Sequence, residues 1–443
     1  MFEKKYSLVI IGAILMAITY AVFNMPTGQQ VAHPPYIVSK LSFAVSAPYT
    51  DTITGTESGR IYALDTLGIL LWKFDGLNAY DYAGWALDVN KVNSDHTVDV
   101  IVGQPWHALA RGNVVVLNGL TGAPLWSAQG SYQPAHFFGA SVSGGGDVNG
   151  DNIPDVLVGE PLLDTAQGTR AGTVYAFDGQ TGALHWKKNG NESFDHFGFG
   201  VKIIDDLNGD NFEDYIVSAP EFGGFPQKSR AGMVSAFASG ISPPFDLIWE
   251  REGVHGSDYL GWSLSIAQDV NGDGIRDILA GAPGSPIITG NANGTGKAHL
   301  LSGRDGAILF SIVGENVGDR FGWSVASLDD INNDGIKDFI VGAPAFDVAG
   351  QEDAGKVYIY DVQGNLLRTI TDSSQNNHFG KSVADVGDFN RDGLGDFLVG
   401  APNVDSVGSN NGRATIYSGV DGSVLWSGDG PISGGRFGWA AAP

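Results

Sequence analysis

The sequence contains no cysteine and comparatively few basic residues. Without thiols the chain has no disulfide bridges, no thiolate metal sites and no cysteine nucleophile. Lys and Arg together number 25 against 49 Asp and Glu, which gives a formal net charge of −24. Nucleic-acid binding requires basic side chains that neutralise phosphates, so we expect no nucleic-acid partner.

Long hydrophobic runs are also rare, and the one that stands out lies at the N-terminus. Lys4 and Lys5 precede an uncharged, mostly apolar stretch from Tyr6 to Phe23. A helix of that length, at about 1.5 Å per residue, approaches the thickness of a bilayer's hydrocarbon core. We expect residues 1–24 to be a signal peptide or a membrane anchor and residues 25–40 a linker, with the remainder outside the cytoplasm.

Glycine is abundant and falls at fixed offsets in a repeat. The chain has 64 glycines without a three-residue period, which excludes collagen, and its hydrophobic content of 43% is sufficient for a core. A short acidic loop recurs roughly every sixty residues, starting at positions 91, 147, 206, 269, 330 and 388. Repeats of this length are typical of solenoids and propellers.

Each repeat contains four strand-like segments in a fixed order, with little helical periodicity. The first includes an aromatic–Gly pair, the second follows the loop and ends near a proline, the third begins after a glycine, and the fourth ends in an aromatic residue. Each type occurs seven times, and the count is complete only if a C-terminal strand from Phe437 to Ala440 joins the N-terminal strand from Phe43 to Pro48. Ring closure removes open sheet edges. We therefore predict an all-β, seven-bladed β-propeller over residues 41–443, preceded by one N-terminal hydrophobic helix.

The acidic loops have the composition of calcium sites. Ca²⁺ prefers six or more oxygen ligands, which carboxylates and amides at alternating positions of a tight loop supply. We expect about five Ca²⁺ ions, with side-chain ligands at loop positions 1, 3, 5 and 9, a backbone carbonyl at position 7, and a left-handed backbone at position 6. The predicted ligands are Asp147, Asn149, Asp151, Ile153 and Asp155; Asp206, Asn208, Asp210, Phe212 and Asp214; Asp269, Asn271, Asp273, Ile275 and Asp277; Asp330, Asn332, Asp334, Ile336 and Asp338; and Asp388, Asn390, Asp392, Leu394 and Asp396.

Two other interpretations of these loops are weaker. The helical calcium hand needs a glutamate at position 12, where this chain has residues such as Val158 and Ala280. A metal-free Asx turn is possible for one copy. Five copies with three crowded carboxylates favour a cation, because like charges repel. In the sixth copy Lys91 replaces the first aspartate, so we expect that site to be empty or weak.

The repeat resembles a known family. The pattern from Phe321-Gly322 through Asp330 to Asp338 and on to Gly342-Ala343-Pro344 is similar to the FG-GAP repeat of integrin α-subunit propellers. This resemblance implies a seven-bladed propeller with Ca²⁺ in inter-strand loops, on a secreted or cell-surface protein that binds partners.

Catalytic signatures are scarce in the sequence. It has no Gly-x-Ser-x-Gly elbow, phosphate loop or HExxH motif. We expect a non-enzymatic extracellular propeller for adhesion or recognition, with a protein or glycan ligand at the cell surface or matrix and a membrane contact through the N-terminal segment if it is retained. A polysaccharide-acting propeller enzyme and a structural surface or filament subunit remain alternatives.

Overall fold

The computed structural model describes residues 40–443 except 96, 132–135, 224–229, 241–245 and 285–291. The predicted N-terminal helix and nearly all of the linker lie outside this range. Among the residues it describes, no helix combines the length and the apolar character needed to span a membrane.

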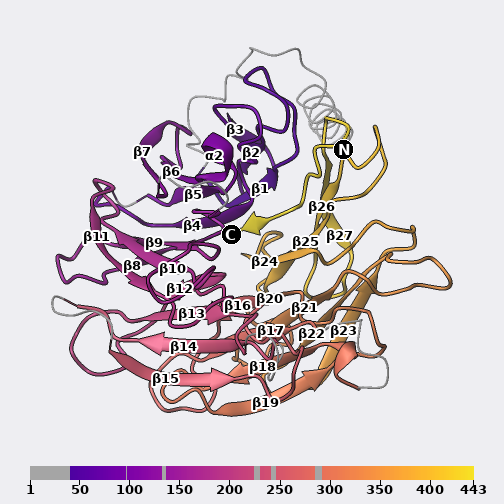
Figure 1. Cartoon of the computed structure of the whole chain (residues 1–443). Coiled ribbons are helices and arrows are strands. Elements are labelled where there is room, and N and C mark those ends of the chain that lie inside the picture. The colour runs from indigo at the N-terminus through magenta and orange to yellow at the C-terminus, as the bar shows by residue number, and fades with distance from the viewer. Residues whose placement is uncertain (1–39, 96, 132–135, 224–229, 241–245, 285–291) are drawn as a thin grey trace, which may run out of the picture.

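Seven four-stranded antiparallel sheets form a ring, as the sequence predicted. In Figure 1 the blades follow one another around a central axis, and the C-terminus lies between β4 and β24. The innermost strands contact one another around this axis. They are β4 (Ala86–Asn90), β8 (Ser141–Gly146), β12 (Gly200–Ile203), β16 (Ser263–Ile266), β20 (Ser324–Ser327), β24 (Ser382–Gly387) and β28 (Ala441–Ala442).

The two middle strands of each blade are almost wholly buried because both of their faces pack against neighbouring blades. The second strands are β5 (Asp99–Gln104), β9 (Asp155–Glu160), β13 (Tyr215–Ala219), β17 (Ile278–Ala282), β21 (Phe339–Ala343), β25 (Asp396–Ala401) and β1 (Phe43–Ala47). The third strands are β6 (Asn113–Leu117), β10 (Thr173–Phe177), β14 (Met233–Phe237), β18 (Lys297–Leu301), β22 (Lys356–Tyr360), β26 (Arg413–Tyr417) and β2 (Arg60–Leu64).

The outer strands are more exposed, and the register shifts once between each of them and the third strand, as at Val116/Leu117. They are β7 (Pro124–Gln129), β11 (Leu184–Asn189), β15 (Leu247–Glu252), β19 (Ile308–Val313), β23 (Leu366–Thr371), β27 (Val424–Asp429) and β3 (Leu70–Asp75). The described residues contain only two short helices, α2 (His107–Ala110) and a 3-10 turn, η1 (Ala292–Thr295).

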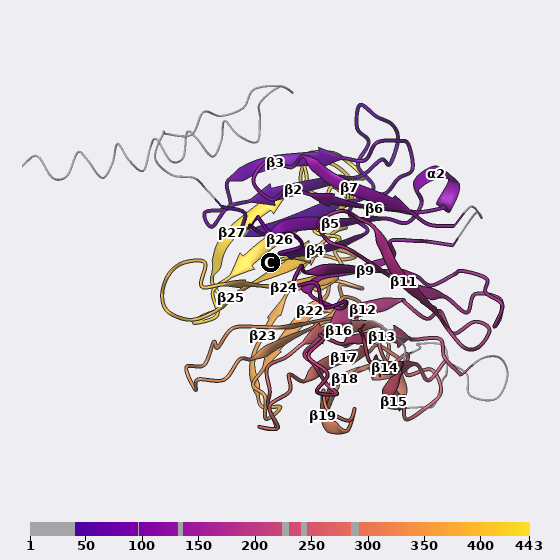
Figure 2. The ribbon, with the colours of Figure 1, turned by 90° about the vertical axis from the view of Figure 1, so that its left-hand side faces the viewer.

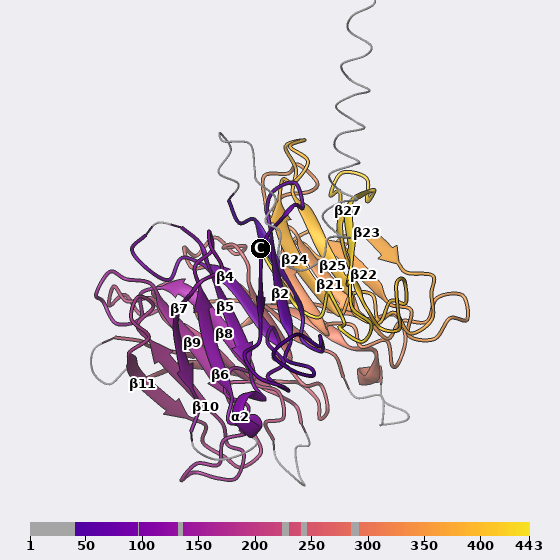
Figure 3. The ribbon, with the colours of Figure 1, turned by 90° about the horizontal axis from the view of Figure 1, so that it is seen from above.

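The ring is closed by both ends of the described chain. Strand β28 pairs with β1 through Ala44 and Ala442, so the first sheet has the order β28-β1-β2-β3. A buried cluster that includes Phe43 and Ile416 joins this sheet to the last blade. Figures 2 and 3 show indigo β2 close to the yellow strands of that blade.

The predicted boundary of the closing strand was wrong by a few residues. Phe437 does not lie in a strand but forms a parallel bridge with Gly412 of the preceding blade, and the strand begins at Ala441. The other phenylalanine–glycine pairs behave alike, since Phe138 bridges Gly112 before β8 begins. The aromatic–Gly pair is therefore an inter-blade clasp rather than part of the inner strand.

The clasp glycine and a second glycine of the repeat, in the second strand, are both required by close backbone approach. A Cβ at Gly342, in β21, would lie 2.1 Å from the carbonyl oxygen of Gly380 in the next blade. Gly380 itself has a φ of +85° and donates its N–H to the carbonyl of Gly400 at 3.1 Å. Ser324 Oγ donates to the Gly380 carbonyl at 2.8 Å. The two glycines of the repeat thus meet between blades, where a side chain would force the blades apart.

Candidate calcium sites

The acidic loops all lie at one end of the propeller. Each complete loop joins the end of an inner strand to the start of the second strand, as loop 147–155 joins β8 to β9. Because the inner strands occupy equivalent places in the ring and run in the same direction, their ends lie on the same face. The structure places all five predicted loops there.

The backbone of each loop wraps around its own side-chain oxygens. In loop 330–338, Asp330 Oδ1 accepts the N–H of Asn333 at 2.6 Å and its Oδ2 accepts the N–H of Gly335 at 2.8 Å. Asn332 Oδ1 accepts the N–H of Asp334 at 2.9 Å. These bonds hold the side-chain oxygens of Asp330 and Asn332 against the backbone of the loop.

The side chains at positions 3, 5 and 9 converge in this loop. Asn332 Nδ2 lies 3.1 Å from Asp334 Oδ2 and 3.4 Å from Asp338 Oδ1. Asp338 Oδ2 accepts the N–H of Ile331 at 2.8 Å, which holds this carboxylate at the base of the loop. The loop therefore gathers carboxylate and amide groups of the kind that Ca²⁺ binds, and the residues present fit this ion.

The same arrangement recurs in the other complete loops. In all five the position-6 N–H donates to the second oxygen of the position-1 aspartate. The position-6 residues have the predicted left-handed backbone: Asn152, Asn211, Gly274, Gly335 and Gly393. Position 4 is left-handed as well, which the sequence analysis missed; its residues are Gly150, Gly209, Gly272, Asn333 and Arg391.

Burial distinguishes the position-9 carboxylates from the others. Burial raises the pKa of Asp155 to about 8, and it raises the pKa of Asp214 and of Asp338 to about 6. By contrast, the N–H donated by Gly274 lowers the pKa of the less buried Asp269. A divalent cation would favour the ionised form of the buried carboxylates, because an opposite charge offsets the cost of removing them from water.

The sixth loop, at residues 91–99, keeps part of this framework without an aspartate at position 1. Asp95 Oδ1 accepts the N–H of Thr97 at 2.9 Å, and Asn93 Nδ2 donates to Asp99 Oδ2 at 2.8 Å. Lys91 is exposed. That this site is empty or weak stays a prediction.

One nearby residue was missed by the sequence analysis. His185, on β11, has its Nε2 3.2 Å from Asp155 Oδ1, and it offers a ligand atom within 4.8 Å of those of Asp151 and Asp178. It was missed because about thirty residues separate it from the loop. The sequence did contain a signal: His185 is a polar residue at a repeat position where β27 has the apolar Leu425.

Comparison with known proteins agrees with the repeat and the propeller fold. The FG-GAP repeat family profile matches residues 138–177, 260–301, 321–360 and 382–417, which fall in four different blades. Integrin alpha-5 of Xenopus laevis is 32% identical over 221 residues, which are 47% of this chain and 20% of that protein. Human integrin alpha-11 is 37% identical over 181 residues, which are 39% of this chain and 14% of that protein.

A second kind of relative aligns over more of the chain. Human phosphatidylinositol-glycan-specific phospholipase D is 27% identical over 400 residues, which are 77% of this chain and 46% of that protein. The aligned region thus spans a fifth or less of these integrins and under half of the phospholipase. Repeat motif, blade count and relatives agree: the chain contains FG-GAP repeats and forms a β-propeller similar to that of integrin α-subunits.

Proposed function

We propose that this chain is a calcium-stabilised propeller that works outside the cell and recognises a protein or glycan without chemically altering it. The observation that carries the proposal is the common architecture of the five complete loops. Each presents a position-1 aspartate that accepts the position-6 N–H and a position-9 carboxylate at most 2% exposed. Such crowding of acids is costly unless a cation intervenes.

About five Ca²⁺ ions would be held in these loops. In loop 388–396 the side chains of Asp388, Asn390, Asp392 and Asp396 and the carbonyl of Leu394 would supply the ligands. Extracellular calcium modules have dissociation constants of about 10⁻⁴ to 10⁻³ M. At a tenfold excess of ion each site would stabilise the fold by about 1.4 kcal/mol, which is substantial for a chain without disulfides.

The relatives support a location outside the cell. Integrin α-subunits and the phosphatidylinositol-glycan-specific phospholipase D are extracellular or cell-surface proteins. An extracellular place would also supply millimolar calcium to weak loops. Retention or cleavage of residues 1–24 would decide between membrane anchoring and release.

An enzymatic role is the second candidate, and one observation favours it. The match to a phospholipase D covers more of this chain than the match to integrin alpha-5 does. Release of a glycosylphosphatidylinositol-anchored protein, or cleavage of a polysaccharide, by the purified protein would establish the enzyme in place of the binder.

The recognition role is tested by capture from native cell surfaces and matrix. The purified propeller should retain a protein or glycan in millimolar calcium and release it in chelator. A matched sample carrying an Asp392→Asn change should show weaker calcium dependence at the altered loop. Absence of any retained component from matrix or cells in calcium would contradict recognition and leave the structural-subunit alternative.

A further inference from the structure

The residues that follow the clasp glycines form a ring around the central axis of the propeller, here called the channel, at the end opposite the acidic loops. Each stands just before an inner strand, whereas the loop follows that strand. A six-residue strand such as β8 separates the two by about 20 Å at roughly 3.3 Å per residue. We call these half-exposed residues the channel-mouth ring: Trp85, Ala140, Phe199, Trp262, Trp323, Lys381 and Trp439.

Aromatic contacts run around much of this ring. The ring centroids of Phe199 and Trp262 are 4.9 Å apart, and those of Trp262 and Trp323 are 4.8 Å apart. On the other side, Trp85 and Trp439 are 5.1 Å apart. The mouth of the channel is thus lined by flat apolar faces contributed by separate blades.

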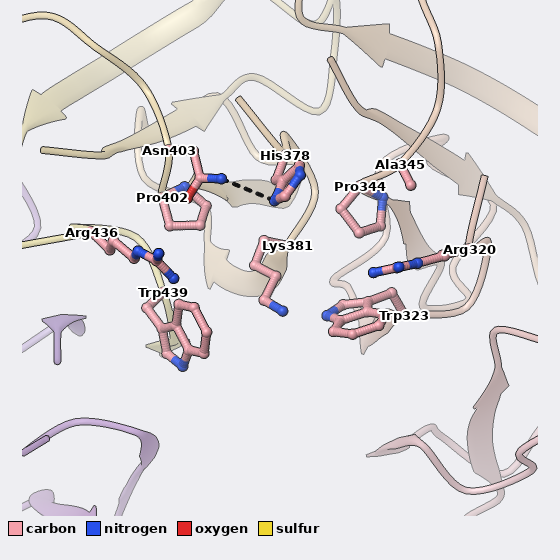
Figure 4. Close-up of a pocket in the computed structure, with 10 residues that line it drawn as sticks. All are labelled: Arg320, Trp323, Pro344, Ala345, His378, Lys381, Pro402, Asn403, Arg436 and Trp439. Carbon is pink, nitrogen blue, oxygen red and sulfur yellow. Dashed lines mark hydrogen bonds between the residues drawn. The ribbon is translucent and has the colours of Figure 1, made fainter. Parts of the chain in front are cut away.

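Lys381 interrupts the aromatic arc and places a charge within it. Its Nζ lies 3.9 Å from the ring centroid of Trp323 and 4.7 Å from that of Trp439. Arg320 lies over Trp323 at 5.2 Å, and Arg436 lies near Trp439 at 5.9 Å. In Figure 4 the Lys381 side chain points into the space between the two indoles, with an arginine on either side.

Lys381, Arg320 and Arg436 line one cavity, and none of the residues that line this cavity is acidic. The lining residues number ten and include His378, but no aspartate or glutamate. Burial and the positive charges of Arg320 and Arg436 lower the pKa of Lys381 to about 7. Within the described part of the chain, no carboxylate forms an ion pair with these three side chains.

The acid that contacts the lining residue His378 is Asp353. Asp353 Oδ2 lies 3.6 Å from His378 Nε2, while the other nitrogen of that imidazole lies 3.1 Å from Asn403 Nδ2. A lysine elsewhere shows the contrast: Lys356 also lies over aromatic rings, but its Nζ is 2.7 Å from Glu315. An unneutralised cluster is unusual in a protein of net charge −24.

We propose that the channel mouth is an anion-binding site for an acidic sugar, in which Lys381, Arg320 and Arg436 hold a carboxylate or sulfate group and Trp323 and Trp439 pack against the sugar ring. Arginine and lysine form charge-assisted hydrogen bonds with such oxyanions. Aromatic walls with a few polar groups are typical of small-molecule sites. The ligand would neutralise the repulsion that the three cations exert on one another.

The cavity has room for a single sugar ring. Its volume is about 220 Å³. At roughly 30 Å³ per water molecule, this is the space of about seven waters, which suits one six-membered ring with its charged substituent. The proposal rests on the recognition function above and names the chemistry of the ligand.

Calorimetric titration in millimolar calcium tests this site, with glucuronate, glucose, inorganic sulfate and an acidic peptide as probes. Glucuronate should bind to the wild type and glucose should not. Lys381→Gln should weaken glucuronate binding about tenfold or more, because a charge-assisted hydrogen bond is lost. Lys381→Arg should retain most of the affinity. Lys356→Gln is the matched control, since it removes a lysine that lies over aromatic rings outside the cavity.

The thermal melt provides a second readout that needs no ligand. Because Lys381 has no acidic partner in the cavity, Lys381→Gln should melt at the wild-type temperature or above it. Equal affinity for glucose and glucuronate, or unchanged affinity in Lys381→Gln, would overturn the proposal. If sulfate binds and glucuronate does not, the cavity is an oxyanion site but not a sugar site. Tighter binding of the acidic peptide than of glucuronate would also exclude the sugar. If calcium-dependent capture succeeds while glucuronate fails, only this inference falls.

Discussion

A single-residue change in one acidic loop separates the role of calcium from that of the loop's own hydrogen bonds. Asp392 is exposed at position 5, and its Oδ1 accepts the N–H of Leu394 at 3.0 Å. Asparagine keeps a carbonyl oxygen for this bond and removes the charge. Position 9 is unsuitable for this substitution, because the buried Asp396 accepts the N–H groups of Phe389 and Gly419. Replacing Asp396 would disturb the turn even when no metal is bound.

The expected magnitude follows from mass action. At a tenfold excess of calcium a site contributes about 1.4 kcal/mol to the free energy of unfolding, and a site weakened tenfold contributes about 0.4 kcal/mol. Asp392→Asn should therefore cost about 1 kcal/mol in calcium and close to nothing in chelator. Five sites together would approach the net stability of a typical domain, about 5–15 kcal/mol.

The assay is urea unfolding of wild type and variant, each in millimolar calcium and in excess chelator. Asp421→Asn is the control: Asp421 is also exposed and accepts a local N–H, from Ser423 at 2.8 Å, but it lies in a turn outside the acidic loops. Asp421→Asn should change the free energy of unfolding by the same amount in calcium and in chelator. Equal destabilisation of Asp392→Asn with and without calcium, or an unchanged wild-type melt in chelator, would refute the reasoning.

Three further predictions follow from other parts of the molecule. Lys91→Asp restores the missing position-1 carboxylate of loop 91–99, so the variant should bind one more calcium ion by equilibrium dialysis; an unchanged stoichiometry would show that other loop residues disable this site. Burial raises the pKa of Asp195 to about 7, so the folded state holds a proton that the unfolded state has lost, and the resulting stabilisation, present at low pH, is lost as the pH rises through 7. Asp195→Asn should therefore raise the free energy of unfolding at pH 8 relative to wild type and flatten its pH dependence between pH 4 and 7. A steeper pH dependence in the variant would contradict this. Deletion of residues 436–443 removes β28 and also the bond that the Ser46 N–H donates to the carbonyl of Ala440 at 3.0 Å, just before that strand. The shortened chain should therefore melt earlier and associate through the exposed edge of β1 in sedimentation; a stable monomer would show that the closure is dispensable.

Several features were predictable because they are local in sequence. The spacing of the aspartates fixed the loop positions, and the left-handed residues at position 6, such as Asn152 and Gly274, follow from residue type. Position 4 was harder, since Arg391 adopts the same conformation despite its side chain. There the hydrogen bonds of the loop override the residue's own preference.

The sequence was less informative where two blades meet. It placed Phe138 and Phe437 in strands because an apolar residue beside a glycine has the period of a strand. In the structure they are clasp residues buried between blades, and Phe138 is 0% exposed. This pairing depends on Gly112 and Gly412 of the preceding blades, which no local pattern reveals.

By itself, the sequence determined the all-β class, the seven-blade count and the acidic loops, because each depends on residues within one repeat or on counting repeats. Only the tertiary structure decided which side chains surround the residues that differ from the repeat pattern. It brought His185 to a loop from another strand and gathered Lys381, Arg320 and Arg436 around one cavity. The ring brings equivalent positions of successive repeats, about sixty residues apart in the sequence, side by side. A residue that differs from its counterparts in the other repeats therefore has neighbours that only the closed fold supplies.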